Sequence, residues 1–285
     1  MELFVETIVL RPYVFLFLAA FLAAATIDLG GRRTLLFAGV ATATAWVAEF
    51  SSTRTGVPFG LYHYTGTTRG HEIFIADVPL MDSLSFAFLG YASFCVARAV
   101  LAARARSRAT LALVTGALMM LLDVVIDPLA VRGDRWFLGR IFFYPDGGAY
   151  FGVPLSNFVG WVVVGTTAVA VYTALAGDEN LDPSLPRIGI ALYYGVLSFN
   201  LSVTAWIGEW RLFALGVAIH AATAVALWRV SRGAALEWAT SNASPYGATV
   251  PIRSGIASRA SRFAPSPEPS SRASQAVTIA THETS

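Results

Sequence analysis

Five carboxyl side chains within or at the ends of apolar runs are expected near the same face of the membrane, and an ionisable group is costly there. They are Glu49, Asp82, Asp123, Asp127 and Glu209. Two of them, in the segment LLDVVIDP, are four residues apart and would share one face of a helix. An Asp, Lys or Arg at the centre of a membrane helix costs about 2.5 to 3.5 kcal/mol on insertion scales, so such acids suggest a function. Paired acids suit general acid and base chemistry.

Glu49 and Asp127 are the strongest candidates for proton transfer. Each is expected at the C-terminal end of a helix, because Pro128 should end the helix that carries Asp127. The negative end of the helix dipole and partial burial both disfavour a charged carboxylate there. We therefore expect either side chain to be able to hold a proton near neutral pH, as a general acid must.

Ion pairing explains the same two acids equally well. Asp127 can pair with Arg132 or Arg135, and Glu49 can pair with Arg54. Such pairs would fix the loops and would perturb the acids without any catalysis.

The remaining polar residues of the apolar runs favour structural roles. Asp82 follows Pro79 by three residues, which is typical of a first-turn partner of the helix dipole. Asp28 and Glu209 suggest interface residues, and His220 suggests a packing histidine with a satisfied ring.

Several cofactor-dependent classes are excluded by composition. All 20 basic residues are Arg, so a lysine Schiff base, as in a retinal-binding rhodopsin, cannot form. Cys95 is the only cysteine, which excludes a disulfide framework, a Cys-based zinc site and an iron–sulfur cluster. His63, His71 and His220 show no HxxxH or HExxH spacing. We predict no metal and no cofactor, and an all-carboxylate metal site stays open as the alternative.

These groups belong to a chain that is too apolar for a soluble domain. Of 285 residues, 55% are hydrophobic and 13% are charged, and the mean hydropathy is +0.60. Soluble domains carry about 25% charged residues, and a membrane-spanning helix needs roughly 20 apolar residues. Seven stretches qualify: 12–30, 34–50, 79–101, 110–126, 155–176, 188–207 and 212–230. The sequence predicts an all-α, polytopic membrane helix bundle over residues 1–232.

The first span and the C-terminal region need separate interpretations. The first span lacks a basic segment before it, so we expect a retained helix and not a signal peptide. From residue 233 the chain is rich in Ser, Ala, Pro, Thr and Arg, which predicts a disordered tail over 233–285. Arginines after the first, third and seventh spans favour a cytoplasmic tail in a bacterial plasma membrane. We expect membrane lipids around the chain and no nucleic-acid partner.

The loops after the second, fourth and sixth spans must share one side of the membrane, whatever the orientation. Two of these loops are rich in aromatic residues, and their candidates for substrate contact are Phe59, Tyr62, Tyr64, Trp136 and Tyr150. An aromatic belt at the membrane interface explains them. They would equally suit an apolar channel whose π faces stabilise a carbocation.

A short motif occurs twice along the chain. Val78-Pro79-Leu80 precedes Asp82, and Val153-Pro154-Leu155 precedes Asn157. Each copy follows a span that ends in acidic residues, so a duplicated helix–loop–helix unit is one interpretation, and chance is the other.

Four segments in order make the chain similar to a known family. They are EF....TGVPFGLYHY, DVPLMDSLSF, LDVVIDPLAV..DRWF and YFGVPLSNFVGW, and they resemble the membrane carotenoid hydratases of the bisanhydrobacterioruberin hydratase (CruF-like) family over residues 40–165. The resemblance implies that water is added to the terminal double bond of an acyclic end group, as in lycopene, γ-carotene or a fifty-carbon precursor. The product would be a tertiary alcohol. The protein would be a cofactor-independent hydro-lyase, a carotenoid 1,2-hydratase, with a carotenoid and water as its partners and with association to other carotenoid biosynthesis enzymes left open.

Hydration of such an alkene requires a proton donor, a tertiary cation and water. We expect Asp127 or Glu49 to supply the proton, and Asp123 or the other acid to take a proton from the attacking water. The expected substrate contacts are Phe59, Tyr62, Tyr64, Asp82, Trp136, Tyr150, Asn157 and Trp161, with Asn157 orienting the water. Two other functions stay open. The same cation captured by a neighbouring double bond would make the protein a carotenoid end-group cyclase, and acids used as coupling sites would suit a transporter or lipid-binding protein.

Overall fold

The structure is a computed structural model that describes residues 2–102, 107–177 and 187–242, with side chains up to residue 230. The α-helices are α1 (Glu2–Leu10), α2 (Pro12–Leu29), α3 (Gly31–Thr55), α4 (Leu80–Val100), α5 (Arg108–Ala130), α6 (Leu155–Ala176), α7 (Arg187–Trp206) and α8 (Trp210–Asn242). The short elements are β1 (His63–Tyr64), β2 (Phe74–Ile75), β3 (Val78–Pro79), the 3-10 turn η1 (Gly133–Arg135) and β4 (Phe142–Phe143).

Seven of these helices, α2 to α8, are long and apolar enough to cross a membrane. Their bounds follow the seven predicted stretches closely, so the predicted all-α membrane bundle is confirmed. The sequence did not predict α1, which has nine residues and is too short to span a bilayer. It joins α2 through Arg11.

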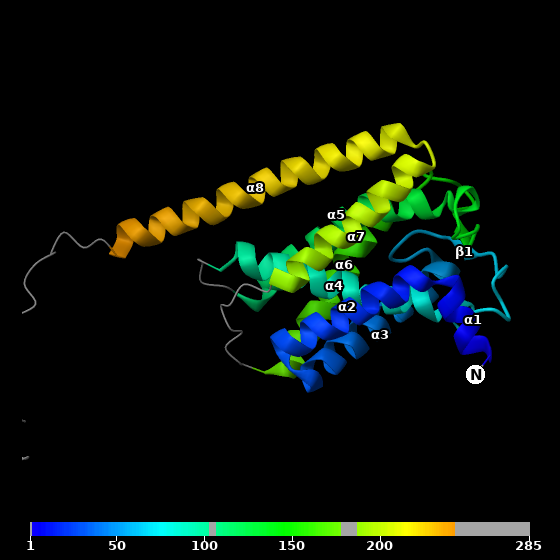
Figure 1. Ribbon diagram of the computed structural model, residues 1–285, viewed down its shortest axis with the longest axis horizontal. Coiled ribbons are helices and arrows are strands. Elements are labelled where there is room, and N and C mark those ends of the chain that lie inside the picture. The colour runs from blue at the N-terminus through cyan, green and yellow to red at the C-terminus, as the bar shows by residue number, and fades with distance from the viewer. Residues whose placement is uncertain (1, 103–106, 178–186, 243–285) are drawn as a thin grey trace, which may run out of the picture. The chain divides into compact units, whose positions relative to one another are not determined.

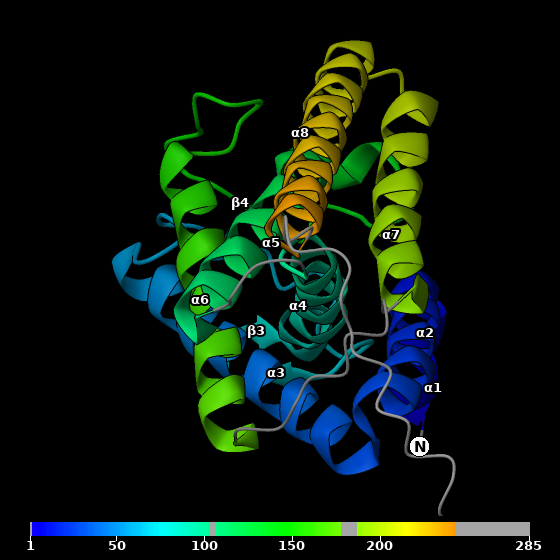
Figure 2. The same cartoon turned by 90° about the vertical axis from the view of Figure 1, so that its left-hand side faces the viewer.

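Helix α4 lies at the centre of the bundle, with α2, α3, α5, α6 and α7 around it (Figure 2). In its apolar window 78% of the residues are buried, against 11% for α8. A helix that is apolar on all sides belongs in an interior. The residues of α4 therefore face other helices, whereas most of α8 is left to face lipid.

Helices α5 and α6 approach closely where two glycines meet. A Cβ on Gly116 would lie 2.4 Å from Thr166 Oγ1 and 2.5 Å from the carbonyl oxygen of Val162. A Cβ on Gly165 would lie 2.9 Å from Gly116 Cα. Small residues allow membrane helices to pack backbone to backbone, so this crossing fixes how the two helices meet.

The loops after α3, α5 and α7 meet at one end of the bundle, as Figure 1 shows around the β1 label. Strand β1 pairs with β4 in antiparallel register, with Tyr64 opposite Phe142. Arg132 and Arg135, which follow α5, form ion pairs with Glu209, which precedes α8. The prediction that these three loops share one side is therefore confirmed.

The prediction that Pro128 ends its helix is wrong, because α5 continues to Ala130. Proline removes one backbone N–H and crowds the preceding turn. The last turn is nevertheless closed by the Val131 N–H, which donates to the Asp127 carbonyl at 2.9 Å. Arg132 Nη1 also donates to the Pro128 carbonyl at 2.7 Å.

The expected position of Glu49 at a helix end is also wrong. Helix α3 continues past it to Thr55 and ends at Gly56, which has φ of 79° and whose N–H donates to the Ser52 carbonyl. A left-handed glycine is a common helix stop. The effect of the helix dipole fades within the last turn. The environment of the Glu49 carboxyl therefore depends on its burial and its neighbours and not on the helix end.

The predicted boundary at residue 232 falls inside α8, which continues to Asn242. The rest of the predicted tail, residues 243–285, lies outside the described part of the chain.

Candidate functional site

A cavity of about 140 Å³ lies at the loop-bearing end of the bundle. A buried water needs roughly 10 to 15 Å³ by this measure, so the cavity has room for a bulky group as well as water. Most of the predicted site residues line it. They are Glu49, Phe59, Tyr62, Tyr64, Asp82, Asp127, Trp136, Asn157 and Trp161. Asp123 and Tyr150 are not among its lining residues.

One wall of the cavity is built from α3 and α4. Glu49 projects from α3 and is only 5% exposed. Ser83 Oγ donates a hydrogen bond to Glu49 Oε2. The Tyr64 hydroxyl interacts with the carboxyls of both Glu49 and Asp82. This wall therefore holds two carboxyls and two hydroxyl groups.

The opposite wall is built from α5 and α6. Asp123 and Asp127 lie one turn apart on α5, and Asn157 lies in the first turn of α6. Asn157 Nδ2 donates to Asp123 Oδ2 at 2.7 Å and to Asp127 Oδ2 at 2.8 Å. Trp161 Nε1 donates to the same Asp127 oxygen at 3.4 Å. One amide group therefore connects the two acids.

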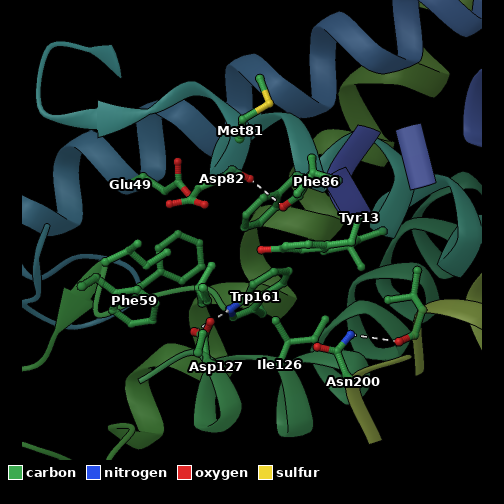
Figure 3. Close-up of a pocket in the computed structure, with 18 of the residues that line it drawn as sticks. Tyr13, Glu49, Phe59, Met81, Asp82, Phe86, Ile126, Asp127, Trp161 and Asn200 are labelled. Carbon is green, nitrogen blue, oxygen red and sulfur yellow. Dashed lines mark hydrogen bonds between the residues drawn. The ribbon is translucent and has the colours of Figure 1, made fainter. Parts of the chain in front are cut away.

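The two walls have the same construction and face each other. Asp82 and Asn157 are each the third residue of a helix that is preceded by a proline cap. In Figure 3 the carboxyls of Glu49 and Asp82 lie on one side of the cavity, and Asp127 lies across from them beside Trp161. Any group bound in the cavity is therefore flanked by acids on two sides.

Aromatic rings line the cavity between the two walls that carry the acids. Phe86 and Trp161 stack with centroids 4.3 Å apart and planes at 11°. Phe59 lies 6.1 Å from each of these rings. Tyr62 contacts Tyr144 at 5.7 Å. Aromatic faces carry negative potential, so this lining can accommodate an apolar group and can stabilise positive charge.

Three tyrosines that cover the cavity from the loops keep their protons. Burial, and then the nearby charge of Glu49, raise the pKa of Tyr62 and of Tyr64 well above the usual value. Burial, and then Asp127, raise the pKa of Tyr144. At ordinary pH their hydroxyls are therefore neutral groups that can donate and accept hydrogen bonds.

The arginines that the sequence offered as partners of the acids pair elsewhere. Arg54 Nη2 lies 2.8 Å from Asp77 Oδ1. Arg132 and Arg135 both pair with Glu209. The proposed pairing of these arginines with Glu49 and Asp127 is therefore wrong, and the cavity acids instead contact hydroxyl, amide and indole groups.

The other polar residues have structural contacts. His220 Nε2 lies 3.0 Å from the Leu121 carbonyl, which confirms a packing histidine. Asp28 pairs with Arg98 at 2.5 Å, at the end of α2 away from the cavity. Within residues 2–102, 107–177 and 187–230, no group of three or more His, Cys, Asp or Glu side chains is arranged to hold a metal ion.

The lining residues that sequence reasoning missed include Tyr13, Phe86 and Asn200. Asn200 is a polar residue within an apolar span, and that signal could have identified it. Phe86 belongs to the DVPLMDSLSF segment but is one phenylalanine among many. Tyr13 follows a helix-starting proline and carries no distinctive pattern.

Comparison with known proteins identifies the family. The chain is 32% identical to the bisanhydrobacterioruberin hydratase of Haloarcula japonica over 151 residues, which are 53% of this chain and 48% of that protein. The alignment thus spans about half the length of that relative. No solved structure matches the chain. The profile of the family described as "Carotenoid biosynthesis protein" matches residues 10–223, which include every element that lines the cavity. This chain is therefore an integral membrane protein that belongs to the carotenoid biosynthesis protein family.

Proposed function

We propose that the protein adds water to the terminal carbon–carbon double bond of an acyclic carotenoid end group and is thus a cofactor-independent hydro-lyase. The observation that carries this proposal is the cavity with carboxyls on two facing walls and aromatic rings between them. The similarity to a hydratase supports the same class of reaction.

Glu49 is the proton donor in this proposal. Protonation at the less substituted carbon of the double bond gives a tertiary cation. The Ser83 hydroxyl beside Glu49 can donate to an ionised carboxylate or accept from a protonated one, so the contact survives both states of Glu49. Phe86 and Trp161 would stabilise the cation through their faces.

Asp127 accepts the proton from the attacking water. Its Oδ2 receives hydrogen bonds from Asn157 and Trp161, and both donors are N–H groups that cannot accept. These contacts hold the Asp127 carboxyl as an acceptor facing the cavity. Loss of the water proton to Asp127 leaves the tertiary alcohol. Glu49 then regains one proton and Asp127 gives one up, so the complete cycle consumes one alkene and one water.

The membrane and the orientation of the protein in it are proposed from the sequence. We place the protein in a bacterial plasma membrane with its C-terminal tail in the cytoplasm, because arginines cluster at that end of the spans. The cavity would then lie near the opposite face. The carotenoid, a long polyene of the lycopene, γ-carotene or fifty-carbon type, would reach it from the lipid, and neighbouring carotenoid enzymes would supply it.

Expression in a lycopene-producing host tests the reaction. The wild-type protein should give a pigment heavier by the mass of one water at each hydrated end. Glu49→Gln and Asp127→Asn should each lower product formation by about a hundredfold or more, as expected for loss of a general acid or base. Asp77 is a partly exposed acid in the loop after α3, and Asp77→Asn is the matched control that should keep full activity. Full activity in both cavity variants would contradict the assignment.

Heavy water separates the two roles. With Asp127→Asn, Glu49 can still protonate the substrate reversibly, so recovered substrate should contain deuterium at the terminal alkene. With Glu49→Gln the recovered substrate should contain none. Pigment left unchanged by the wild-type protein with all three substrate types would favour transport or lipid binding. A ring-containing product of unchanged mass would instead favour a cyclase.

A further inference from the structure

Two oxygens behind the cavity wall that α5 and α6 form lack hydrogen-bond partners among the described residues. They are Asp123 Oδ1 and the Tyr150 hydroxyl, and both atoms are buried. Asp123 is fully buried, and its other oxygen is held by Asn157. A buried polar atom without a partner costs about 1 to 3 kcal/mol. Two such atoms beside one acid therefore point to a site that binds something polar.

The two groups are near each other. Burial, and then the charge of Asp123, raise the pKa of Tyr150. The packing brings them to the same place, because the Tyr150 ring lies 5.2 Å from the ring of Phe158, and Phe158 follows Asn157, whose amide holds Asp123. A neutral tyrosine hydroxyl both donates and accepts, which a proton-carrying group requires.

The loop between β4 and α6 is built to hold Tyr150 in place. Tyr150 and Val153 exchange backbone hydrogen bonds of 3.1 and 2.9 Å. Arg132 Nη1 donates to the Phe151 carbonyl at 2.8 Å, and the same nitrogen binds Pro128 at the end of α5. Phe151 adopts a φ of 50°, a conformation that costs a non-glycine residue roughly 1 to 3 kcal/mol and survives only where its surroundings impose it. The loop is therefore fastened to α5, the helix that carries Asp123.

We propose that Asp123 and Tyr150 bind a water molecule between their free oxygens and together form a proton relay from Asp127 to the loop-bearing face of the membrane. The proposal rests on the proposed function, in which Asp127 gains a proton in every turnover. Asp127 passes this proton to Asp123, because the two carboxyls lie side by side on the same Asn157 amide nitrogen. The bound water carries it to the Tyr150 hydroxyl, which passes its own proton to water that enters from the loop-bearing face. Only O–H bonds are broken and formed, and no other reactant is needed.

The matched variants are Tyr150→Phe and Tyr172→Phe. Each removes one buried hydroxyl that has no partner among the described residues, but Tyr172 lies toward the other end of α6. Tyr150→Phe should lower kcat by about tenfold or more with little change in KM, since the relay serves acid and base catalysis and not substrate binding. Tyr172→Phe should change neither. In an Asp123→Asn background, adding Tyr150→Phe should have no further effect. An unchanged kcat in Tyr150→Phe, an equal loss in Tyr172→Phe or fully additive losses would overturn the relay.

Infrared spectroscopy of the purified protein in lipid tests the relay without any substrate. The bands assigned to Asp123 are those that Asp123→Asn removes. Tyr150→Phe should shift these bands and change their response to heavy water, whereas Tyr172→Phe should leave them unchanged. If the shift occurs in a protein that hydrates no carotenoid, the proposed function fails, and only the water-bridged contact between Asp123 and Tyr150 stands. If Tyr150→Phe leaves the frequency of the Asp123 bands and their response to heavy water unchanged, the relay fails even where hydration is observed.

Discussion

At the scale of single residues, a buried ion pair between Arg11 and Glu72 supports one wall of the cavity. Arg11 Nη2 lies 2.8 Å from Glu72 Oε1, and the two side chains are 1% and 0% exposed. The pair joins the start of α2 to the loop that leads into α4, and the charge of Arg11 also acts on Asp82 in the cavity wall. The charges and hydrogen bonds of this pair thus help to fix one acid of the site.

Removal of one partner of this pair should destabilise the protein strongly. Arg11→Met leaves Glu72 as a buried charge without its partner, which costs about 3 to 5 kcal/mol. Thermal unfolding in detergent should therefore show a clear loss of stability for Arg11→Met. The double variant Arg11→Met with Glu72→Met should recover much of it, because an apolar pair can replace a buried ion pair. A single variant as stable as the wild-type protein would refute this role.

The acids of the site were predictable, but their partners were not. The cost of placing Glu49, Asp123 and Asp127 in apolar runs is visible in the sequence. Which groups they contact depends on helix packing. Ser83 and Asn157 reach them because α4 and α6 begin at the level where α3 and α5 carry their acids. No local sequence pattern shows that these helices begin at that level. Arginines that are near in sequence were therefore predicted as partners of the acids, and that prediction was wrong.

At the scale of the helices, the glycine crossing of α5 and α6 holds the second wall together. Gly116 and Gly165 let the two backbones meet. The same two helices carry Asp123, Asp127, Asn157 and the stacked Trp161. A small change in their separation would move the amide away from both acids.

A methyl group at this crossing should therefore reduce both stability and activity. The Cβ of Gly116→Ala would meet the Val162 carbonyl at 2.5 Å, and backbone cannot turn aside as a flexible side chain can. Overpacking of this kind costs about 1 to 3 kcal/mol. Gly195→Ala on α7 has open space around its Cβ and is the control. It should be neutral or slightly stabilising, since glycine weakens a helix interior by roughly 0.5 to 1 kcal/mol. Equal unfolding temperatures for the two variants would contradict this account.

Helix positions were predictable from apolar length, but helix ends were not. The ends depend on caps. Helix α3, for example, ends at the left-handed Gly56, seven residues after Glu49. The same holds for Pro128, which the last turn of α5 tolerates. The two-residue pairing of β1 with β4 joins loops that are distant in sequence, and only the assembled bundle brings them together.

At the scale of the whole molecule, the side of the membrane on which each loop lies can be measured with a thiol reagent. Cys95 is fully buried and should contribute little background. Thr67 and Asp146 lie exposed in the loops after α3 and α5, and Ser107 lies exposed at the start of α5. Cysteines at the first two positions should react from one side of the membrane, and a cysteine at Ser107 should react from the other.

Impermeant maleimide on intact and on broken cells distinguishes the sides. With the proposed cytoplasmic tail, Thr67→Cys and Asp146→Cys should react in intact cells, and Ser107→Cys should react only after the membrane is opened. The reverse pattern would invert the proposed orientation while keeping the fold. Labelling of Thr67→Cys and Ser107→Cys from the same side would contradict the arrangement of spans itself.

The amide of Asn157 also has a consequence for biogenesis. Because α5 is synthesised before α6, Asp123 and Asp127 reach the membrane before Asn157, whose amide hydrogen-bonds to both. An acid in hydrocarbon costs most at the helix centre, about 2.5 to 3.5 kcal/mol, and Asp123 and Asp127 lie in the C-terminal third of α5. Although α5 is apolar enough to insert by itself, we expect it to be more stable in the bilayer once α6 has followed it as a hairpin. Full stability of the first half of the protein in the membrane thus awaits the same residue that arranges the cavity.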